Sequence, residues 1–233
     1  MGTVMYMKKG EVHTAPYIPT IPLSELMEGT IVMIEENGVK VPFYVAQQEF
    51  TDGGSTNVNR VLMVRKECYD TRAWHDSNVN SYDDSTINSW LTKTYLRMFS
   101  ESVQDAIATT KIVVTVGNGN GNTYWPAKSV FLLSMTELGF TLTVDSGNVL
   151  AEGVKLPTAT LLKTATLNGE AVAQWTRTPD TNDTTNAYSV SASGGKSSKA
   201  CTTVLGCRPC FTLPSSALVS EIPNADGSVD LRI

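Results

Sequence analysis

The stretch Trp175-Thr-Arg-Thr-Pro179 and the later stretch Gly206-Cys-Arg-Pro209 enclose a run of small polar residues in the last third of the chain. Each stretch contains an arginine and a proline, and a guanidinium group can tie loops to backbone carbonyls or carboxylates. Trp175 adds a large ring that gains from burial. We therefore expect two pieces of rigid scaffold with a surface segment, residues 182–203, between them. The expected scaffold residues are Trp175, Arg177, Gly206, Arg208 and Pro209.

Length and composition describe an ordinary globular protein. With 233 residues and 41% hydrophobic content the chain can bury a substantial core. We expect an extended, proline-interrupted arm over residues 1–22 and one domain over residues 23–233. A net charge of -5 and a pI near 5.1 give no reason to favour nucleic acid. No segment reaches the roughly 20 apolar residues that span a bilayer, and residues 1–10 lack the apolar stretch of a secretory signal.

Local patterns predict the first strands. Residues 30–35 and 40–46 alternate on either side of Asn37-Gly38, which is a strong hairpin signal. Residues 60–66 predict a third strand. These short strands follow the arm directly and begin the domain.

Helix signals are concentrated in two places. Apolar residues from Ile87 to Phe99 recur at three- and four-residue spacing, which predicts a helix of about four turns, and Ser100 can cap a second helix. Ser134 and Glu137 have the spacing of a capping box. The Gly-Asn repeat at residues 117–122 lacks dinucleotide or Walker spacing, so we expect a plain loop there.

The four cysteines do not predict a disulfide framework for a chain of this size. Cys207 and Cys210 match the spacing of a redox motif or half of a zinc site, but a second pair of ligands is missing. They lie in a strand-like run, where buried thiols serve as small hydrophobic groups. Cys201 lies in the polar segment, where it can be exposed.

No combination of residues in the sequence has the pattern of a catalytic site. His75, Asp76 and Ser77 are neighbours in sequence, whereas a catalytic triad needs spatial convergence and an oxyanion hole. We expect a loop that satisfies its own backbone. Asp83 and Asp84 precede a helix, where acidic residues act as caps and dipole partners. We therefore predict no catalytic residue, no metal site and no cofactor.

Several motifs in the same order resemble an uncharacterised family of bacterial and phage domains. They are Trp74-His-Asp-Ser-Asn and the run that continues to Leu91, then Val130-Phe-Leu-Leu-Ser134, then the two arginine stretches. Members of the family usually have the sequence Trp-Leu-Arg-Ser-Pro followed by Gly-Val-Arg-Pro-Ala, and the similarity covers residues 23–219. The closing pattern is similar to the fold shared by formylglycine-generating enzymes and variable proteins of diversity-generating retroelements. The resemblance implies an α+β, C-type-lectin-like fold, with two main helices packed on small antiparallel sheets and much irregular loop.

The resemblance also implies a function. In retroelement-diversified proteins, mutated adenines turn Asn codons into a scatter of other residues, and residues 186–205 look like such a scatter. Lys196, Lys199 and Leu205 fit an Asn codon less well, and undiversified family members keep an Asn-, Ser- and Gly-rich segment here. The implied protein is a non-enzymatic phage or bacterial adhesin or receptor-binding module on a virion or cell surface, with a protein or glycan ligand. The expected ligand-binding residues are Tyr188, Val190, Ala192, Lys196, Ser198, Lys199 and Thr203.

Two alternatives remain. A copper- and thiol-dependent oxidase related to formylglycine-generating enzymes would use Cys207 and Cys210. A structural virion subunit, or a homo-oligomer, would assemble through the arm at residues 1–22. Calcium dependence is not implied, because the Glu-Pro-Asn and Trp-Asn-Asp motifs of calcium-binding lectins are missing.

Overall fold

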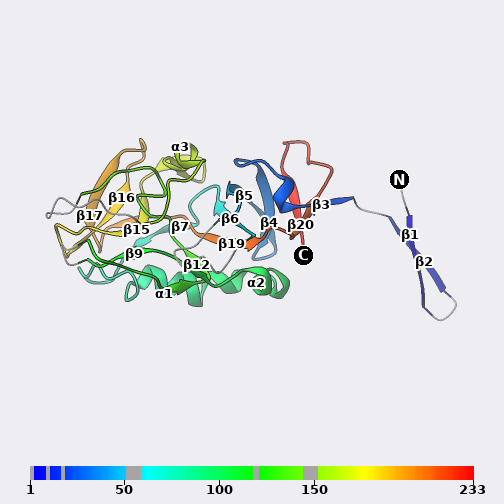
Figure 1. Cartoon of the computed structure of the whole chain (residues 1–233), viewed down its shortest axis with the longest axis horizontal. Coiled ribbons are helices and arrows are strands. Elements are labelled where there is room, and N and C mark those ends of the chain that lie inside the picture. Colours follow the sequence, from blue (N-terminus) through cyan, green and yellow to red (C-terminus); the bar gives the residue numbers. More distant parts are fainter. Residues whose placement is uncertain (1–2, 9–10, 17–18, 51–58, 118–120, 144–151) are drawn as a thin grey trace.

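Most of the chain's regular structure is β-strand, gathered mainly in two large sheets (Figure 1). The computed structural model describes residues 3–8, 11–16, 19–50, 59–117, 121–143 and 152–233. Strands account for 39% and helices for 13%. The expectation of an α+β, C-type-lectin-like fold with two main helices is therefore wrong, because the three α-helices of the described residues are all short.

The helices have identifiable starts, and α1 also has a local contact near its end that weakens helical geometry. Helix α1 begins after Ser85, whose hydroxyl accepts a hydrogen bond from the amide of Asn88. Near its end, Thr92 donates to the Asn88 carbonyl (2.9 Å), a contact that weakens and bends helices, and a 3₁₀ turn follows. Ser100 caps α2 as predicted. The helical elements are η1 (Leu23–Glu25), α1 (Thr86–Lys93), η2 (Tyr95–Met98), α2 (Glu101–Ala106) and α3 (Ala159–Leu162).

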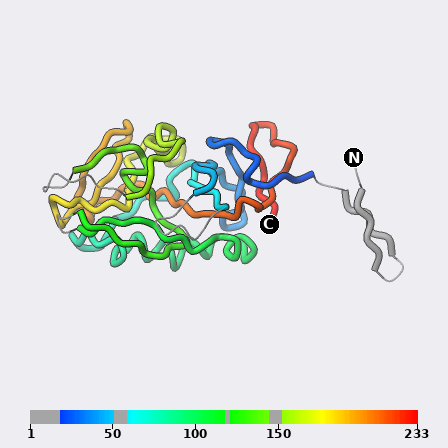
Figure 2. The backbone as a smooth tube through the Cα atoms, in the orientation of Figure 1, coloured from blue at the N-terminus to red at the C-terminus, as the bar shows by residue number. Residues whose placement is uncertain are grey.

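The larger sheet has eight strands in the order β12-β19-β6-β5-β4-β21-β20-β3. The predicted hairpin between β4 and β5 is confirmed, and its turn residues Asn37 and Gly38 have φ of 52° and 75°. The last strand, β21, pairs in parallel with β4, and β20 pairs with β3. The C-terminal strands of the chain therefore lie beside the first strands of this sheet (Figure 2). The bounds are β3 (Thr20–Pro22), β4 (Ile31–Glu36), β5 (Val39–Gln47), β6 (Arg60–Arg65), β12 (Val130–Phe131), β19 (Cys210–Pro214), β20 (Leu218–Ser220) and β21 (Val229–Arg232).

The second sheet has five strands in the order β17-β16-β15-β18-β7. Along the described strands the chain changes sheet four times: from β6 to β7, from β7 to β12, from β12 to β15, and from β18 through Arg208-Pro209 to β19. The Gly206-Cys-Arg-Pro209 stretch is therefore a short, direct junction of the two sheets. The bounds are β7 (Asp70–Ala73), β15 (Gln174–Pro179), β16 (Asn186–Val190), β17 (Lys196–Ala200) and β18 (Val204–Cys207).

The remaining strands form two-stranded pairs. In the expected arm, β1 pairs with β2, whereas β3 joins the eight-stranded sheet. The pairs are β1 (Thr3–Lys8) with β2 (Glu11–Pro16), β8 (Thr110–Lys111) with β11 (Ala127–Lys128), β9 (Val114–Thr115) with β10 (Thr123–Tyr124), and β13 (Ala165–Leu167) with β14 (Glu170–Val172). Among the described helices, none has the length and apolar character needed to cross a membrane.

An aromatic cluster joins the helical segment to the larger sheet. Phe43 of β5 and Phe211 of β19 lie 5.3 Å apart between ring centroids, and Phe99 contacts both at 6.2 and 5.2 Å. Tyr95 packs edge-on against Phe99 (5.4 Å). All four side chains are buried, so α1, η2 and α2 lie along the sheets as a covering layer (Figure 1).

Candidate functional site

Asn80 joins the loops at one end of the five-stranded sheet. It is 4% exposed, and its Nδ2 donates to the carbonyls of Asp180 (2.7 Å), Asp183 (3.1 Å) and Asn186 (3.1 Å). A Cβ atom on Gly117 would lie 2.1 Å from Asn80 Oδ1, so this close approach requires glycine. Three loops therefore meet at one buried amide. We call them the loop cluster: residues 78–84, 115–117 and 180–186.

The loop cluster surrounds an open hollow of about 700 Å³, which is within the size range of small-ligand sites. Asp83 forms an ion pair with Lys128 (2.6 Å), and Asp84 accepts a hydrogen bond from Ser81 (2.7 Å). Burial, followed by the charge of Asp83, raises the pKa of Tyr124 above its ordinary value, so the phenol stays protonated. The hollow is thus walled by groups that can form hydrogen bonds.

Strand β17 and the turn that follows it adjoin the loop cluster through two side-chain contacts. Ser198 donates from Oγ to Asp180 Oδ2 (2.5 Å), and Thr202 donates from Oγ1 to Asn78 Oδ1 (3.2 Å). The strand is also an edge of its sheet. Residues 182–203 and the loop cluster consequently form one continuous end of the molecule, which we call the loop end; Figure 1 shows β16 and β17 at this end.

The structure divides the predicted ligand-binding residues into two groups. Tyr188 and Val190 lie on β16 and are only 8% and 0% exposed. Because β16 has a paired strand on each edge and is covered on both faces, these side chains belong to the core, and we correct their assignment as surface contacts. The others are exposed or half-buried: Ala192, Lys196, Ser198, Lys199 and Thr203.

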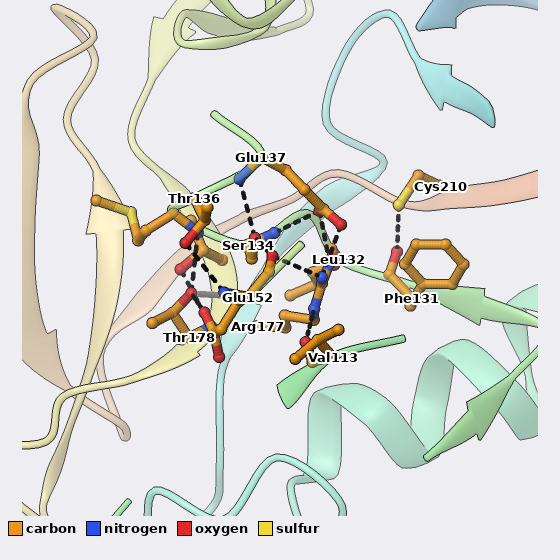
Figure 3. A network of polar contacts seen from close by, with 12 residues as sticks. Val113, Phe131, Leu132, Ser134, Thr136, Glu137, Glu152, Arg177, Thr178 and Cys210 are labelled. Atoms are coloured by element: carbon orange, nitrogen blue, oxygen red, sulfur yellow. Dashed lines mark hydrogen bonds and ion pairs between the residues drawn. The ribbon is translucent and has the colours of Figure 1, made fainter. Parts of the chain in front are cut away.

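Arg177 is the centre of a buried polar network (Figure 3). Its guanidinium forms a two-pronged ion pair with Glu137 (2.6 and 2.7 Å) and donates to the carbonyls of Val113 and Leu132 (both 2.9 Å). Burial alone would lower the pKa of Arg177, but Glu137 and then Glu152 raise it above its ordinary value, so the group remains charged. The network ties β15 to the loops beside it.

A second buried carboxylate, Glu152, completes this network (Figure 3). It accepts hydrogen bonds from the amide of Thr115 (2.7 Å) and the hydroxyl of Thr178. Ser134 donates to its backbone carbonyl (2.6 Å). Burial raises the pKa of Glu152, although the charge of Arg177 opposes this shift. Because Thr115 lines the hollow, Glu152 positions one wall of it from the interior.

Arg208 holds the junction of the two sheets. Its guanidinium donates to the carbonyls of Arg65 (2.7 Å), Lys66 (2.8 Å), Leu162 (3.0 Å) and Thr164 (3.0 Å). Burial lowers its pKa below the ordinary value. Four backbone carbonyls are therefore satisfied by one side chain, which fixes the chain where it passes from one sheet to the other.

The other expected scaffold residues also lie in the interior. Trp175 donates from Nε1 to the carbonyl of Arg72 (3.0 Å), and the Pro209 carbonyl accepts a backbone hydrogen bond from β6 (3.0 Å). A Cβ atom on Gly206 would lie 2.6 Å from the sulfur of Cys68. Trp175 thereby ties β15 to β7, and Pro209 ties the junction of the sheets to β6.

The cysteines are buried, including Cys201, whose expected exposure is corrected. The loop after β17 folds inward, and the Cys201 amide donates to the Thr185 carbonyl (3.0 Å). Burial raises the pKa of Cys201 to about 12 and those of Cys207 and Cys210 well above their ordinary value. Neutral buried thiols are poor nucleophiles and metal ligands, so their environment gives the thiol-oxidase alternative no support.

The His75 loop hydrogen-bonds to itself. Its Nδ1 accepts from the amide of Ser77 (2.9 Å) and lies 3.0 Å from the Ser77 hydroxyl. The backbone amide of His75 donates to the Cys201 carbonyl (3.0 Å). Within the described part of the chain, no group of three or more His, Cys, Asp or Glu side chains is placed to hold a metal ion.

Fold and site together define a β-rich domain in which buried arginines support an open polar surface. Residues 58–215 match a family described as "Domain of unknown function (DUF6273)". This match covers more than half of the chain, and the chain belongs to that family. No curated protein and no solved structure matches the chain. The matched segment includes the loop cluster and both scaffold arginines, whereas β3 to β5, β20 and β21 lie outside it.

The sequence patterns did not single out Asn80 or Glu152. Asn80 lies in an ordinary polar loop, and its partners are 100 or more residues away. The Gly-Asn repeat that begins at Gly117 was the one local sign of a close approach. Glu137 was identified through its capping box, but nothing in the spacing linked it to Arg177.

Proposed function

We propose that the chain is a non-enzymatic ligand-binding protein that uses the loop end as its binding surface. The observation that carries this proposal is the contrast between two paired strands. Residues 187–190 of β16 are buried, whereas the neighbouring β17 exposes Lys196 and Lys199 at the edge of the sheet. Surface side chains away from caps and buried networks can change at little cost to stability. Binding specificity can therefore vary on β17 while the interior is preserved.

The contacts beneath this surface support the proposal. The loop cluster is held by Asn80, which bonds to backbone carbonyls, and by the buried Glu152, which accepts the Thr115 amide. Arg177 in turn donates to the Glu152 backbone carbonyl (3.4 Å). Backbone carbonyls are present whatever side chains the loops carry. A site held in this way keeps its shape when its exposed residues differ.

The motif resemblance adds a specific form of this function. We propose an adhesin or receptor-binding module at a virion or cell surface, with a protein or glycan ligand and a display segment diversified by a retroelement. The burial of residues 187–190 in β16 leaves residues 191–205 as the part of the segment 186–205 that we propose for display. Mutations at residues 187–190 would reach the core and destabilise the domain.

Sequencing the encoding locus tests diversification. We expect a nearby reverse transcriptase and a near-copy of codons 180–212 that differs mainly at adenines, with differences concentrated in codons 191–205. Differences concentrated in codons 187–190 would contradict the proposed display surface. Absence of both genetic elements would remove diversification and leave a fixed binding domain.

A binding screen tests the surface itself. Labelled protein is applied to bacterial cells and glycan arrays. Each cell type or glycan that binds it is then tested with the double variant K196A/K199A. A matched control, K93A/R97A, removes two exposed cations from the helical side of the molecule. We expect the first variant to lose binding by about tenfold or more and the control to bind normally. Equal loss of binding in both variants would indicate non-specific charge attraction and would contradict the assignment of the loop end as the binding surface.

A further inference from the structure

Strand β17 is an open edge of the five-stranded sheet (Figure 1). It pairs with β16 through five consecutive residues without a bulge, and no described strand pairs with its other side. The strand contains no proline, and its Lys196 and Lys199 are exposed. Edge strands are usually kept from pairing by shortness, bulges, proline, a cover or charge. Of these protections, β17 has charge alone.

The other three edges of the two large sheets are blocked. β12 has only two residues, and β3 ends at Pro22. Beside β7, the Ile87 amide of helix α1 donates to the Trp74 carbonyl (3.1 Å). Arg72 of β7 also stacks on Trp90 of this helix, with 3.3 Å from Cζ to the ring centroid. Among the described strands of these sheets, β17 is therefore the edge that is open to a further strand.

The ladder between β16 and β17 fixes which backbone groups of β17 point outward. At one end the Ser191 amide donates to the Gly195 carbonyl (2.8 Å), and at the other the Cys201 amide donates to the Thr185 carbonyl (3.0 Å). Hydrogen-bonded and non-hydrogen-bonded pairs alternate along an antiparallel ladder. In this register the odd-numbered residues of β17 bond to β16, so the even-numbered ones direct their amides and carbonyls away from it.

The outward backbone groups belong to Lys196, Ser198 and Ala200. The Ala200 carbonyl accepts the Thr203 amide in a turn (2.8 Å). A further strand can therefore bond to the amides and carbonyls of Lys196 and Ser198 and to the amide of Ala200. Main-chain bonds of this kind supply affinity in strand addition, whereas side chains supply specificity.

Two lysines select the kind of strand that can be added. Lys196 and Lys199 point to opposite faces of the sheet, because side chains alternate along a strand. Neither is in an ion pair with another described residue. The β17 strand of a second copy would bring two more lysines to this edge, and edge lysines oppose such pairing. An acidic strand with the spacing Glu-x-x-Glu instead places one carboxylate beside each lysine.

We propose that β17 binds an extended, acidic segment of a partner protein, which joins the five-stranded sheet as a further strand. Its main chain bonds to Lys196, Ser198 and Ala200, and acidic side chains three positions apart contact Lys196 and Lys199. This inference rests on the proposed ligand-binding function and deepens it by naming the class of ligand. It also suits a variable display segment, because the edge backbone stays the same when the side chains of β17 change.

Titration with short peptides tests the open edge. The full-length protein is titrated with acetyl-Thr-Glu-Val-Thr-Glu-Val-Thr-amide and with a counterpart that has Lys in place of each Glu. We expect saturable binding of the acidic peptide and at least about tenfold weaker binding of the basic one. Amide hydrogen exchange is followed by NMR. In the free protein Lys196 and Ser198 should exchange faster than Ser197 and Lys199, and the acidic peptide should slow them.

N-methylated peptides separate strand addition from charge attraction. Two versions of the acidic peptide carry N-methyl groups on alternate residues, one on the odd and one on the even positions. The two glutamates set the register, and only every second amide of an added strand faces β17. One version should therefore lose binding and the other should keep it, although both carry the same charge.

A double variant measures the role of the lysines. K196A/K199A should weaken the acidic peptide about three- to tenfold, because it removes the complementary charge but leaves the outward backbone groups. The matched control K93A/R97A removes two exposed cations from the helical side and should bind the acidic peptide like the original protein. Added salt should weaken binding to the original protein, since exposed charges are screened.

The outcomes separate this inference from the broader proposal. Equal binding of the acidic and basic peptides, unchanged exchange at Lys196 and Ser198, or equal binding of the two N-methylated versions would overturn it. No saturable binding of the acidic peptide would overturn it as well. If that happens while K196A/K199A still loses the ligand found in the binding screen, the proposed function stands without strand addition. If K196A/K199A keeps that ligand, the proposed function itself fails.

Discussion

Arg177 and Glu137 form a two-pronged ion pair in the interior, with side chains that are 1% and 3% exposed. The same Glu137 carboxylate accepts the Ser134 amide (2.8 Å), while the Ser134 hydroxyl accepts the Glu137 amide (3.0 Å). A local capping box is thereby joined to an arginine 40 residues further along the chain. The ion pair combines two motifs that the sequence indicates separately.

Breaking this ion pair should be strongly destabilising. R177L leaves Glu137 buried without its partner, and we expect a loss of about 3–5 kcal/mol in the free energy of unfolding. The double variant R177L/E137L should cost less than the sum of the single variants, because it leaves neither charge unpaired. Urea unfolding measures the stability of the two single variants and the double variant.

The control is D70N, which breaks the partly exposed pair with Arg72 and should cost at most about 1 kcal/mol. If the losses of the two single variants simply add up in the double variant, the buried pair is not coupled.

Glu152 should make stability fall as the pH rises. Burial raises its pKa, so the folded protein retains a proton that the unfolded chain releases near the ordinary value of 4.5. The folded state then binds more protons than the unfolded state, and stability decreases from about pH 4.5 up through the raised folded pKa. E152Q keeps the shape without the charge, so its stability relative to the original protein should improve with rising pH. Urea midpoints at pH 4, 5.5 and 7 measure this, and a relative decline of E152Q would refute it.

Gly206 should not tolerate a side chain. A Cβ atom there would lie 2.6 Å from Cys68 Sγ and 2.9 Å from the backbone carbonyl of Ala173, so G206A should cost about 1–3 kcal/mol by overpacking. C68A/G206A should recover part of the loss because it removes the sulfur but not the carbonyl. Thermal melts of the variants provide the test. The control is G169A, where a Cβ atom would meet nothing within 4 Å but φ is +83°, so any cost there reflects backbone strain without a clash.

The thiols should be unreactive in the folded protein. All four cysteines are buried, and burial raises their pKa values, to about 11 for Cys68 and about 12 for Cys201. An aromatic disulfide reagent at pH 7.5 should therefore react slowly with native protein and rapidly with all four thiols in urea. Fast reaction of native Cys207 or Cys210 would instead revive the thiol-oxidase alternative.

Part of the fold was predictable because some elements depend on neighbouring residues. The hairpin at Asn37-Gly38, the caps at Ser85 and Ser100 and the box at Ser134 all form between residues close in sequence. The helix lengths were not predictable in this way. The spacing from Ile87 to Phe99 suits one continuous helix, but its residues pack on two sheets through an α-helix and a separate 3₁₀ turn.

By itself, the sequence determined the turns, the caps and the candidate arginine scaffold, because these follow from the conformational limits and bonding capacity of individual residues. Tertiary structure decided that β16 is core while β17 is surface, since both lie in one polar segment and strand order places β16 between two strands and β17 at the edge. It also decided the loop end, because the three carbonyls that Asn80 binds are brought to it by sheet pairing across 100 or more residues. Burial and long-range hydrogen bonds are properties of the assembled sheets, so no local pattern could specify them.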